Sequence, residues 1–145
     1  MIEAVRSACA ADLTDLDYLQ CLARDGLIEA RGGQRLLAEQ PATDWSQAIH
    51  DQSTVTLVAT LDDSIVGYLE LHIASGLAEV RQVFVHLEAR QVGLGDWLLE
   101  AAIDHARNRA CTLIEGVALP GDRDTKNLYE RAGITARKII VSQVL

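Results

Sequence analysis

The stretch Arg90-Gln91-Val92-Gly93-Leu94-Gly95 decides the fold of this 145-residue chain, because it joins a strand-like segment to a long amphipathic one. Its two glycines let the backbone approach a ligand closely, and the first turn of a helix carries N–H groups that have no acceptor within the helix. Such donors suit a diphosphate, although a short glycine loop is also typical of a plain turn. The stretch lacks the Lys-Ser or Lys-Thr of a P-loop and the third glycine of a dinucleotide-binding loop.

The chain after this stretch alternates helix and strand. Residues 94 to about 109 predict a long helix with an apolar stripe made by Leu98, Leu99, Ala102, Ile103 and Ala106. Residues 112–118 predict a buried strand, and residues 125–132 predict a short helix that Gly133 ends as a C-cap. The β-rich residues 136–145 leave room for one last strand.

The chain before the stretch begins with a predicted strand and several short helices. Residues 2–6 predict the strand, and Asp12 or Thr14 is a candidate cap for an amphipathic helix. Short helices are predicted at 34–39 and 43–49.

Three predicted strands then lead to the glycine stretch. Residues 55–61 and 65–73 alternate apolar and polar side chains, and Asp62-Asp63 between them predicts a tight hairpin turn. The third strand covers residues 77–86, where a β-bulge at 81–82 would keep the later valines on the buried side. A helix between two strands implies a parallel crossover, so we expect an α/β (α+β) fold whose mixed central sheet is flanked by helices. No repeat or linker interrupts the chain, and residues 1–145 are expected to form a single domain.

Composition restricts the partners. The formal net charge of -8 argues against nucleic acid, because phosphate binding leaves a basic footprint. Residues 1–104 carry six Lys or Arg against seventeen Asp or Glu, whereas residues 105–145 carry seven against four. This split suits a cationic acceptor on one side and an anionic cofactor on the other, or is simply solvated charge.

The sequence shows no sign of export or of a metal site. Its acidic start is unlike a signal peptide, and no apolar run reaches the roughly 20 residues that cross a bilayer, so we expect a soluble cytoplasmic protein without membrane contact. Cys9, Cys21 and Cys111 lie far apart without CxxC spacing. We expect them to be buried reduced thiols, with a catalytic cysteine as the alternative.

The stretch 90–95 resembles the Gln/Arg-x-x-Gly-x-Gly/Ala acyl-CoA signature of the GNAT superfamily, with Arg90 at the first position and glycines at the last two. Gln91 stands where members often carry glycine. The block 127–134 is similar to the later Leu-Tyr-Glu-x-x-Gly-Phe block of the family, with Ile134 in place of the aromatic residue. The resemblance implies the GNAT-type acyl-CoA N-acyltransferase fold over nearly the whole chain, with a shortened C-terminal strand region.

The resemblance also implies the activity, an acyl-CoA-dependent N-acetyltransferase in which a primary amine attacks the thioester directly. It assigns binding of the cosubstrate acetyl-CoA to Val83, Phe84, Val85, Arg90, Gln91, Val92, Gly93, Leu94, Gly95 and Asn127. A backbone N–H at the bulge is expected to stabilise the developing oxyanion.

One residue is expected to donate a proton during the reaction, and another is expected to accept one. Tyr129 is the expected acid, because a phenol with a pKa of about 10 is protonated at pH 7 and can protonate a thiolate whose thiol has a pKa near 8.5; the alternative is a packed ring. Glu79 is the expected base, directly or through water, since its place eleven residues before Arg90 resembles that of the base glutamate in histone-acetylating members. A solvated strand glutamate is the alternative, with His72 as the reserve base.

The acceptor is expected to be a small-molecule amine or a protein or peptide amine. GNAT proteins commonly end with two strands after the tyrosine helix, whereas ten residues follow Thr135 here. The acceptor wall is therefore expected either to be shorter or to come from the partner subunit of a homodimer. The alternative function is a catalytically inactive acyl-CoA-binding sensor or interaction module of the same fold, and a purely structural domain is the third.

Overall fold

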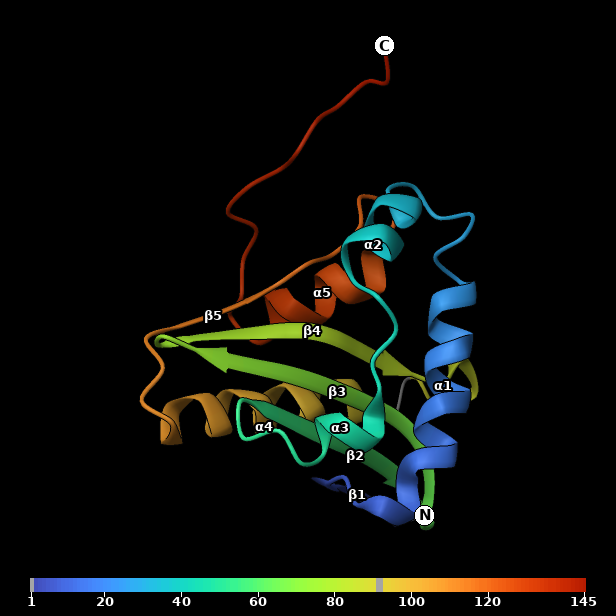
Figure 1. The fold of residues 1–145 in the computed structure, drawn as a ribbon, viewed down its shortest axis with the longest axis vertical. Coiled ribbons are helices and arrows are strands. Elements are labelled where there is room, and N and C mark those ends of the chain that lie inside the picture. The colour runs from blue at the N-terminus through green and yellow to red at the C-terminus, as the bar shows by residue number, and fades with distance from the viewer. Residues whose placement is uncertain (1, 91–92) are drawn as a thin grey trace.

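A computed structural model describes residues 2–90 and 93–145, in which five strands form one mixed sheet in the order β1-β2-β3-β4-β5 (Figure 1). The strands are β1 (Glu3–Ser7), β2 (Thr54–Leu61), β3 (Ser64–Ala74), β4 (Leu77–Val85) and β5 (Leu113–Gly116). The α-helices are α1 (Leu13–Asp25), α2 (Gly33–Glu39), α3 (Trp45–Ala48), α4 (Leu94–Asn108) and α5 (Arg123–Arg131), and the 3-10 turns are η1 (Ala10–Asp12) and η2 (Leu87–Ala89). Neighbouring strands are antiparallel except β4 and β5, which run parallel. The predicted mixed sheet with its crossover helix is confirmed.

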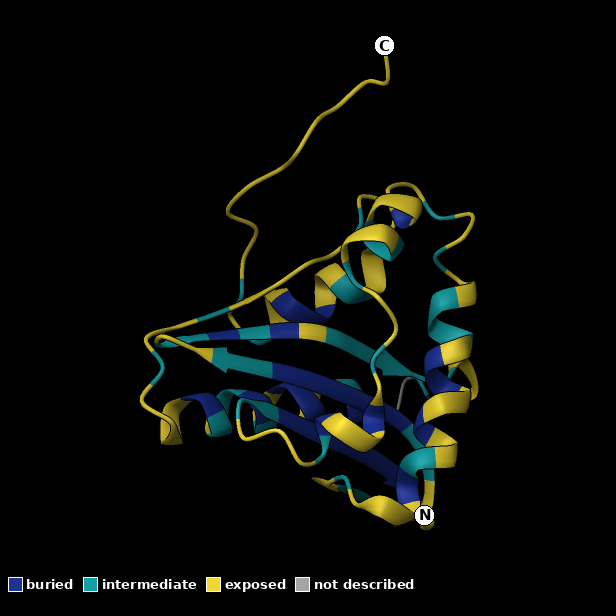
Figure 2. Ribbon diagram, viewed as in Figure 1, coloured by how far each residue is buried: buried dark blue, intermediate teal, exposed yellow. Residues whose placement is uncertain are grey.

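Helices cover both faces of the sheet, so the protein has two apolar cores. α4 and α5 pack on one face, where the buried side chains include Leu57, Leu69, Leu71, Leu98, Leu99 and Ala102. α1 and α3 pack on the other face, where the buried side chains include Leu16, Leu19, Trp45, Val58 and Tyr68. Figure 2 shows that the central strands carry the most continuous buried stretch. No helix within the described residues is long and apolar enough to cross a bilayer.

A single extra residue bends β4. Arg81 has no partner in β3, because the register advances by two residues on β4 and by one on β3 between Val80 and Gln82. The predicted bulge is thus confirmed, and a bulge increases the twist and bends the strand that carries it. Pairing with β5 ends at Val80, opposite Gly116, whereas β4 continues to Val85. The two parallel strands therefore diverge from the bulge onward.

The turn between β2 and β3 is also as predicted. Asp62 and Asp63 have φ of 50° and 69°, and the strands pair directly on either side of them. Positive φ at both central positions belongs to the tight hairpin turn whose twist matches that of the strands, and aspartate tolerates it better than most residues.

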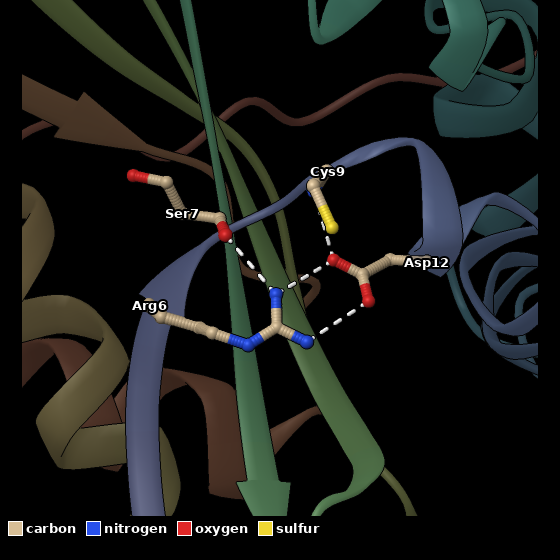
Figure 3. Close-up of polar contacts among 4 residues, drawn as sticks. All are labelled: Arg6, Ser7, Cys9 and Asp12. Atoms are coloured by element: carbon tan, nitrogen blue, oxygen red, sulfur yellow. Dashed lines mark hydrogen bonds and ion pairs between the residues drawn. The ribbon is translucent and has the colours of Figure 1, made fainter.

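An ion pair fixes the chain between β1 and α1 (Figure 3). Arg6 donates two hydrogen bonds to the Asp12 carboxylate, at 2.7 and 2.9 Å, and a third to the carbonyl oxygen of Ser7 at 3.1 Å. The carboxylate also accepts the backbone N–H of Cys9 at 2.8 Å. The hydrogen bonds from Arg6 hold the pKa of Asp12 below its usual range. Asp12 stands at the N-cap position of α1 as predicted, but its side chain serves the preceding turn and does not cap the helix.

The prediction of a last strand over 136–145 is wrong. These residues form no regular element and run away from the body of the molecule (Figure 1), with Ile139, Val141 and Val144 exposed. A strand needs a neighbour for its N–H and C=O groups, and no segment that the structure describes pairs with this one. β-propensity alone therefore does not make a strand here.

Two further expectations are only partly right. The strand expected over 112–118 exists as β5, but it is short and mostly exposed because it lies at the edge of the sheet. Of the three cysteines, Cys9 and Cys21 are exposed and Cys111 is partly buried, although burial was expected for all.

Candidate functional site

A cleft of about 1540 Å³ opens where β4 and β5 diverge. Its lining includes Leu94 and Tyr129 from the core under α4, and Ala48 and Tyr68 from the core under α1 and α3. Residues of both cores can share one cleft only if it reaches both faces of the sheet. The gap that starts at the bulge provides that passage, so two molecules can meet in it from opposite sides.

At one end the cleft meets the N-terminus of α4. Gly93 is the N-cap with φ of 80°, and a Cβ built there would meet no atom within 4 Å, so the surface above it is open. The Trp97 N–H donates to the Gly93 carbonyl at 3.1 Å, whereas the N–H groups of Leu94, Gly95 and Asp96 come too early in the helix to have an acceptor within it. Because these residues line the cleft, their geometry fits a phosphate-bearing ligand.

The charged side chains at this end are largely paired. Asp96 would repel an anion, but Arg131 holds its carboxylate at 2.9 Å. Arg90 folds back on the end of β4, where its Nε donates to the Val85 carbonyl at 2.9 Å and its guanidinium lies 5.7 Å from the centre of the Phe84 ring. The backbone donors of α4 are therefore the main anion-binding groups here.

Most of the residues predicted to bind the cosubstrate come together in this cleft. Those that line it are Val83, Phe84, Val85, Arg90, Gly93, Leu94, Gly95 and Asn127. Gln91 and Val92 lie outside the described residues. From Arg81 to Val85 the edge of β4 that faces β5 has no strand partner among the described residues, so it presents backbone groups to the cleft.

Tyr129 lies on α5 against the end of β5. The helix begins at Arg123, and the carboxylate of the preceding Asp122 caps it by accepting the Thr125 N–H at 3.0 Å. Tyr129 is 6% exposed. Its hydroxyl would overlap any Cβ at Gly116, so the ring can pack there only because residue 116 has no side chain.

Tyr129 lines the cleft, and its hydroxyl holds its proton tightly. The hydroxyl makes no hydrogen bond to any described residue. Burial, and secondarily the charge of Asp122, raise the pKa of Tyr129 well above its ordinary value. The phenol therefore stays protonated at any pH at which the protein works.

Glu79 does not line the cleft. Its side chain is half exposed and lies 3.6 Å from the Arg81 guanidinium, opposite His72 of β3 and Glu115 of β5. The structure thus does not bring Glu79 and Tyr129 into one site. His72 is not part of the lining either.

A buried polar network at the other end of the cleft was not predicted. The Gln82 carbonyl accepts the Tyr68 hydroxyl at 2.8 Å, and the Gln82 Nε2 lies 3.0 Å from oxygens of Gln20, Thr43 and Glu70. Gln20 also exchanges two hydrogen bonds with the backbone of Thr43. These residues come from α1, β3, β4 and the segment before α3. The one signal for them in the sequence is the polar Glu70 and Gln82 within strands that are otherwise mainly apolar.

The chain matches the family model described as "Acetyltransferase (GNAT) family" over residues 23–134. No curated protein sequence matches it. Among solved structures, the aminoglycoside N-acetyltransferase AAC(6')-Iy in complex with CoA has a TM-score of 0.72 at 16% identity, over 98% of this chain and 100% of that one. A ribosomal-protein-alanine N-acetyltransferase from Brucella melitensis biovar Abortus 2308 has a TM-score of 0.68 at 21% identity, over 100% and 99%. A mutant protein from Bacillus halodurans reaches 0.78 at 16%, over 100% and 99%.

At these identities the likeness to solved structures concerns the fold, which is the mixed sheet with the β4–β5 divergence described above. The family match is a matter of sequence, and it spans both the glycine stretch and the tyrosine block. Sequence and fold agree, and the chain belongs to the GNAT family of acetyltransferases.

Proposed function

We propose that the protein is an acyl-CoA-dependent N-acetyltransferase that moves an acetyl group from acetyl-CoA to a primary amine. The observation that carries the proposal is the cleft at the β4–β5 divergence, which joins the N-terminus of α4 and the Tyr129 hydroxyl. Family membership and a CoA-bound protein of the same fold support it. Two of the similar structures are named as acetyltransferases of an aminoglycoside and of a ribosomal-protein alanine, both of which are amines.

The backbone would hold the cosubstrate. The N–H groups of Leu94, Gly95 and Asp96 would bind the diphosphate, since a hydrogen bond to a charged group contributes about 1.5 to 3 kcal/mol and the helix dipole only about 0.3 to 1 kcal/mol. The free edge of β4 beyond Arg81 would pair with the amides of the pantetheine arm. When bound, acetyl-CoA supplies an acetyl group already activated as a thioester.

Tyr129 would serve as the acid that protonates the departing sulfur. Its raised pKa keeps the proton on the phenol until the thiolate forms. Removal from water also makes a thiolate more basic, so burial shifts the donor and the acceptor in the same direction. A backbone N–H at the bulge would stabilise the oxyanion that precedes the departure.

The attacking amine must first lose a proton. At pH 7 an alkyl ammonium with a pKa of about 10.4 is neutral in roughly one molecule in 2,500, which costs about 4.6 kcal/mol. Glu79 lies outside the cleft lining, so we propose it as a base only through water. Glu79→Gln should then lower kcat/KM at pH 7 by at least about tenfold, and an unchanged value would remove Glu79 from the mechanism.

The direct test is release of CoA thiol from acetyl-CoA against a broad panel of amines. Tyr129→Phe should lower kcat by about 100-fold or more while the Kd for acetyl-CoA stays the same, because only the proton is lost. Tyr18→Phe is the matched control, since Tyr18 is exposed on α1. An undiminished kcat in Tyr129→Phe would rule out the acid role.

A catalytically inactive acyl-CoA-binding module is the second candidate. It predicts heat of acetyl-CoA binding in calorimetry with no thiol release above hydrolysis for any amine. The open cleft that reaches both faces favours the enzyme, because a sensor needs room for only one molecule.

We further propose that the protein works in the cytoplasm. We also propose that a second copy covers β5. The second copy is supported by the outer edge of β5, which has no partner among the described residues, and by Leu113 in β5 and Val117 just after it, which are more than half exposed. The apolar segment 136–145 offers a strand that could pair there. Sedimentation at twice the mass of the chain is expected, and sedimentation at the monomer mass would contradict the dimer.

A further inference from the structure

The cleft contains a buried carboxylate that the proposed chemistry does not use. Glu70 is 3% exposed and lies in β3 between two leucines of the core under α4. Its Oε1 accepts the Thr43 hydroxyl at 2.7 Å and the Gln82 Nε2 at 3.0 Å, and no hydrogen bond from a described residue ends on Oε2. Glu70 lines the cleft, so Oε2 is the carboxylate oxygen left to meet a ligand there.

This carboxylate lacks a positive partner in the protein. A buried charge is costly unless it is both paired and hydrogen-bonded, and its two donors here are neutral groups on the same oxygen. Four arginines line the same cleft, and each is engaged elsewhere. Arg24 donates to the Gln40 carbonyl at 2.7 Å, and Arg81 lies 3.6 Å from Glu79. Arg90 donates to the Val85 carbonyl, and Arg131 pairs with Asp96. No ion pair joins Glu70 to any Lys or Arg in the part of the chain that the structure describes. Its second oxygen can therefore accept a cation from outside the protein.

The surrounding network fixes the direction of this oxygen. Gln82 is held through its carbonyl by Tyr68 and through its amide by Gln20 and Thr43, and the Thr43 backbone is in turn held by Gln20. A side chain tied into such a network loses little further freedom when it binds a ligand. Glu70 is thus arranged in advance, in the part of the cleft that α1, β3, β4 and the segment before α3 form.

We propose that Glu70 binds a second positive charge on the acceptor, so that the preferred substrates are di- or polyamines; this rests on the proposed acetyl transfer. The charge cannot be the reacting nitrogen, because that nitrogen must be neutral to attack and a carboxylate beside it would raise its pKa. Glu70 is therefore a specificity residue that contacts the substrate away from the bond that forms.

The test compares 1,3-diaminopropane, 1,4-diaminobutane and 1,5-diaminopentane with the monoamines of the same chain length. The wild-type protein should prefer at least one diamine over its monoamine by about 10- to 100-fold in kcat/KM, the range expected for a hydrogen bond to a charged group. Glu70→Gln keeps the shape and the bonds to Thr43 and Gln82, and should reduce the preference to within about threefold with the KM for acetyl-CoA unchanged. Glu29→Gln makes the same charge change at an exposed site outside the cleft and should keep the preference.

Calorimetric titration of the diamines into the CoA-bound protein separates this inference from the proposed function. Diamine binding that depends on Glu70 without thiol release would support the site and refute the transferase. Absence of any diamine preference in the wild type, or a preference that survives in Glu70→Gln, would overturn the role of Glu70. If Glu70→Gln does not fold, Glu70→Asp keeps the charge one methylene further back and should shift the preference to the next longer diamine; an unshifted preference would equally refute it.

Discussion

At the α4 end of the cleft the available binding groups belong to the backbone, whereas at the α1 end they belong to side chains. The first end offers the N–H groups of residues 94–96 and the unpaired edge of β4. The second offers the network of Gln20, Thr43, Glu70 and Gln82. Backbone groups are positioned by secondary structure and survive most substitutions, but a side-chain network changes with each one. We therefore expect cosubstrate affinity and amine preference to respond to separate mutations.

The largest effect should follow from deletion of Arg81. Without this residue the register from Val80 to Gln82 becomes regular, so β4 should straighten, pair further along β5 and close the gap. The protein should remain folded, because the other strand pairs are unchanged, while the Kd for acetyl-CoA rises about 100-fold through loss of the free strand edge. Isothermal calorimetry measures the Kd, and circular dichroism measures the fold.

Arg81→Ala is the control for this deletion, since it keeps the extra residue and removes only the side chain. Its Kd for acetyl-CoA should stay within about threefold of the wild-type value. If the deletion bound acetyl-CoA as well as Arg81→Ala does, the bulge would not be the cause of the open cleft.

An intermediate effect is expected for Gln82→Met. The change removes one amide that serves Tyr68, Gln20, Thr43 and Glu70, so it leaves buried polar groups without partners and should lower the free energy of unfolding by about 2 kcal/mol. Urea denaturation measures this loss. The Kd for acetyl-CoA should not change, because Gln82 would meet the cosubstrate only through its backbone, which the substitution keeps. A stable variant with weakened acetyl-CoA binding would contradict the division between the two ends.

A smaller effect compares one tyrosine from each end at high pH. Burial raises the pKa of both Tyr68 and Tyr129 above the ordinary value of 10. Because the folded pKa exceeds the unfolded one, each ring's contribution is complete below pH 10 and is lost as the pH rises through the folded pKa. At pH 11, ionisation stabilises the unfolded chain by about 1.4 kcal/mol for each tyrosine that ionises in the unfolded chain but not in the folded protein.

The test is the fall in unfolding free energy between pH 8 and pH 11. It should be smaller by about 1 kcal/mol in Tyr129→Phe than in the wild type. Tyr68→Phe should show the same reduction, together with a loss at every pH from its missing bond to Gln82. Equal slopes in all three proteins would mean that neither ring resists ionisation in the folded state.

The two ends also differ in how well the sequence predicted them. The glycine stretch, the Asp62-Asp63 turn and the bulge at Arg81 depend on residues close together in the chain, and all lie where local rules placed them. The polar network joins residues up to 62 positions apart, such as Gln20 and Gln82, so it becomes visible only once the sheet and α1 are in place. The tyrosine was located by its block, whereas the contact with Gly116 that seats it required the structure.

The prediction from sequence was weakest where it used a residue's local preference and did not include the neighbours that the residue meets in the fold. The residues of 136–145 favour extended backbone, yet no described strand receives them. Glu79 matched a position in a motif, and its role as a base stays a prediction; the structure adds that its side chain lies near Arg81 and outside the cleft lining. Both cases depend on the surroundings of a residue, about which a pattern of neighbours says little.

Because Tyr129 packs on Gly116, the residue tolerated at each of these two positions depends on the residue at the other. Any β-carbon at 116 would displace the phenol, whereas a small residue at 129 would leave a hole under the end of β5. A descendant that acquired alanine at 116 would therefore lose the hydroxyl's position before it could gain anything from the new side chain. A substitution at one of these sites is therefore tolerated only together with a matching substitution at the other. Laboratory libraries that vary the two positions one at a time will miss every functional combination that requires both changes.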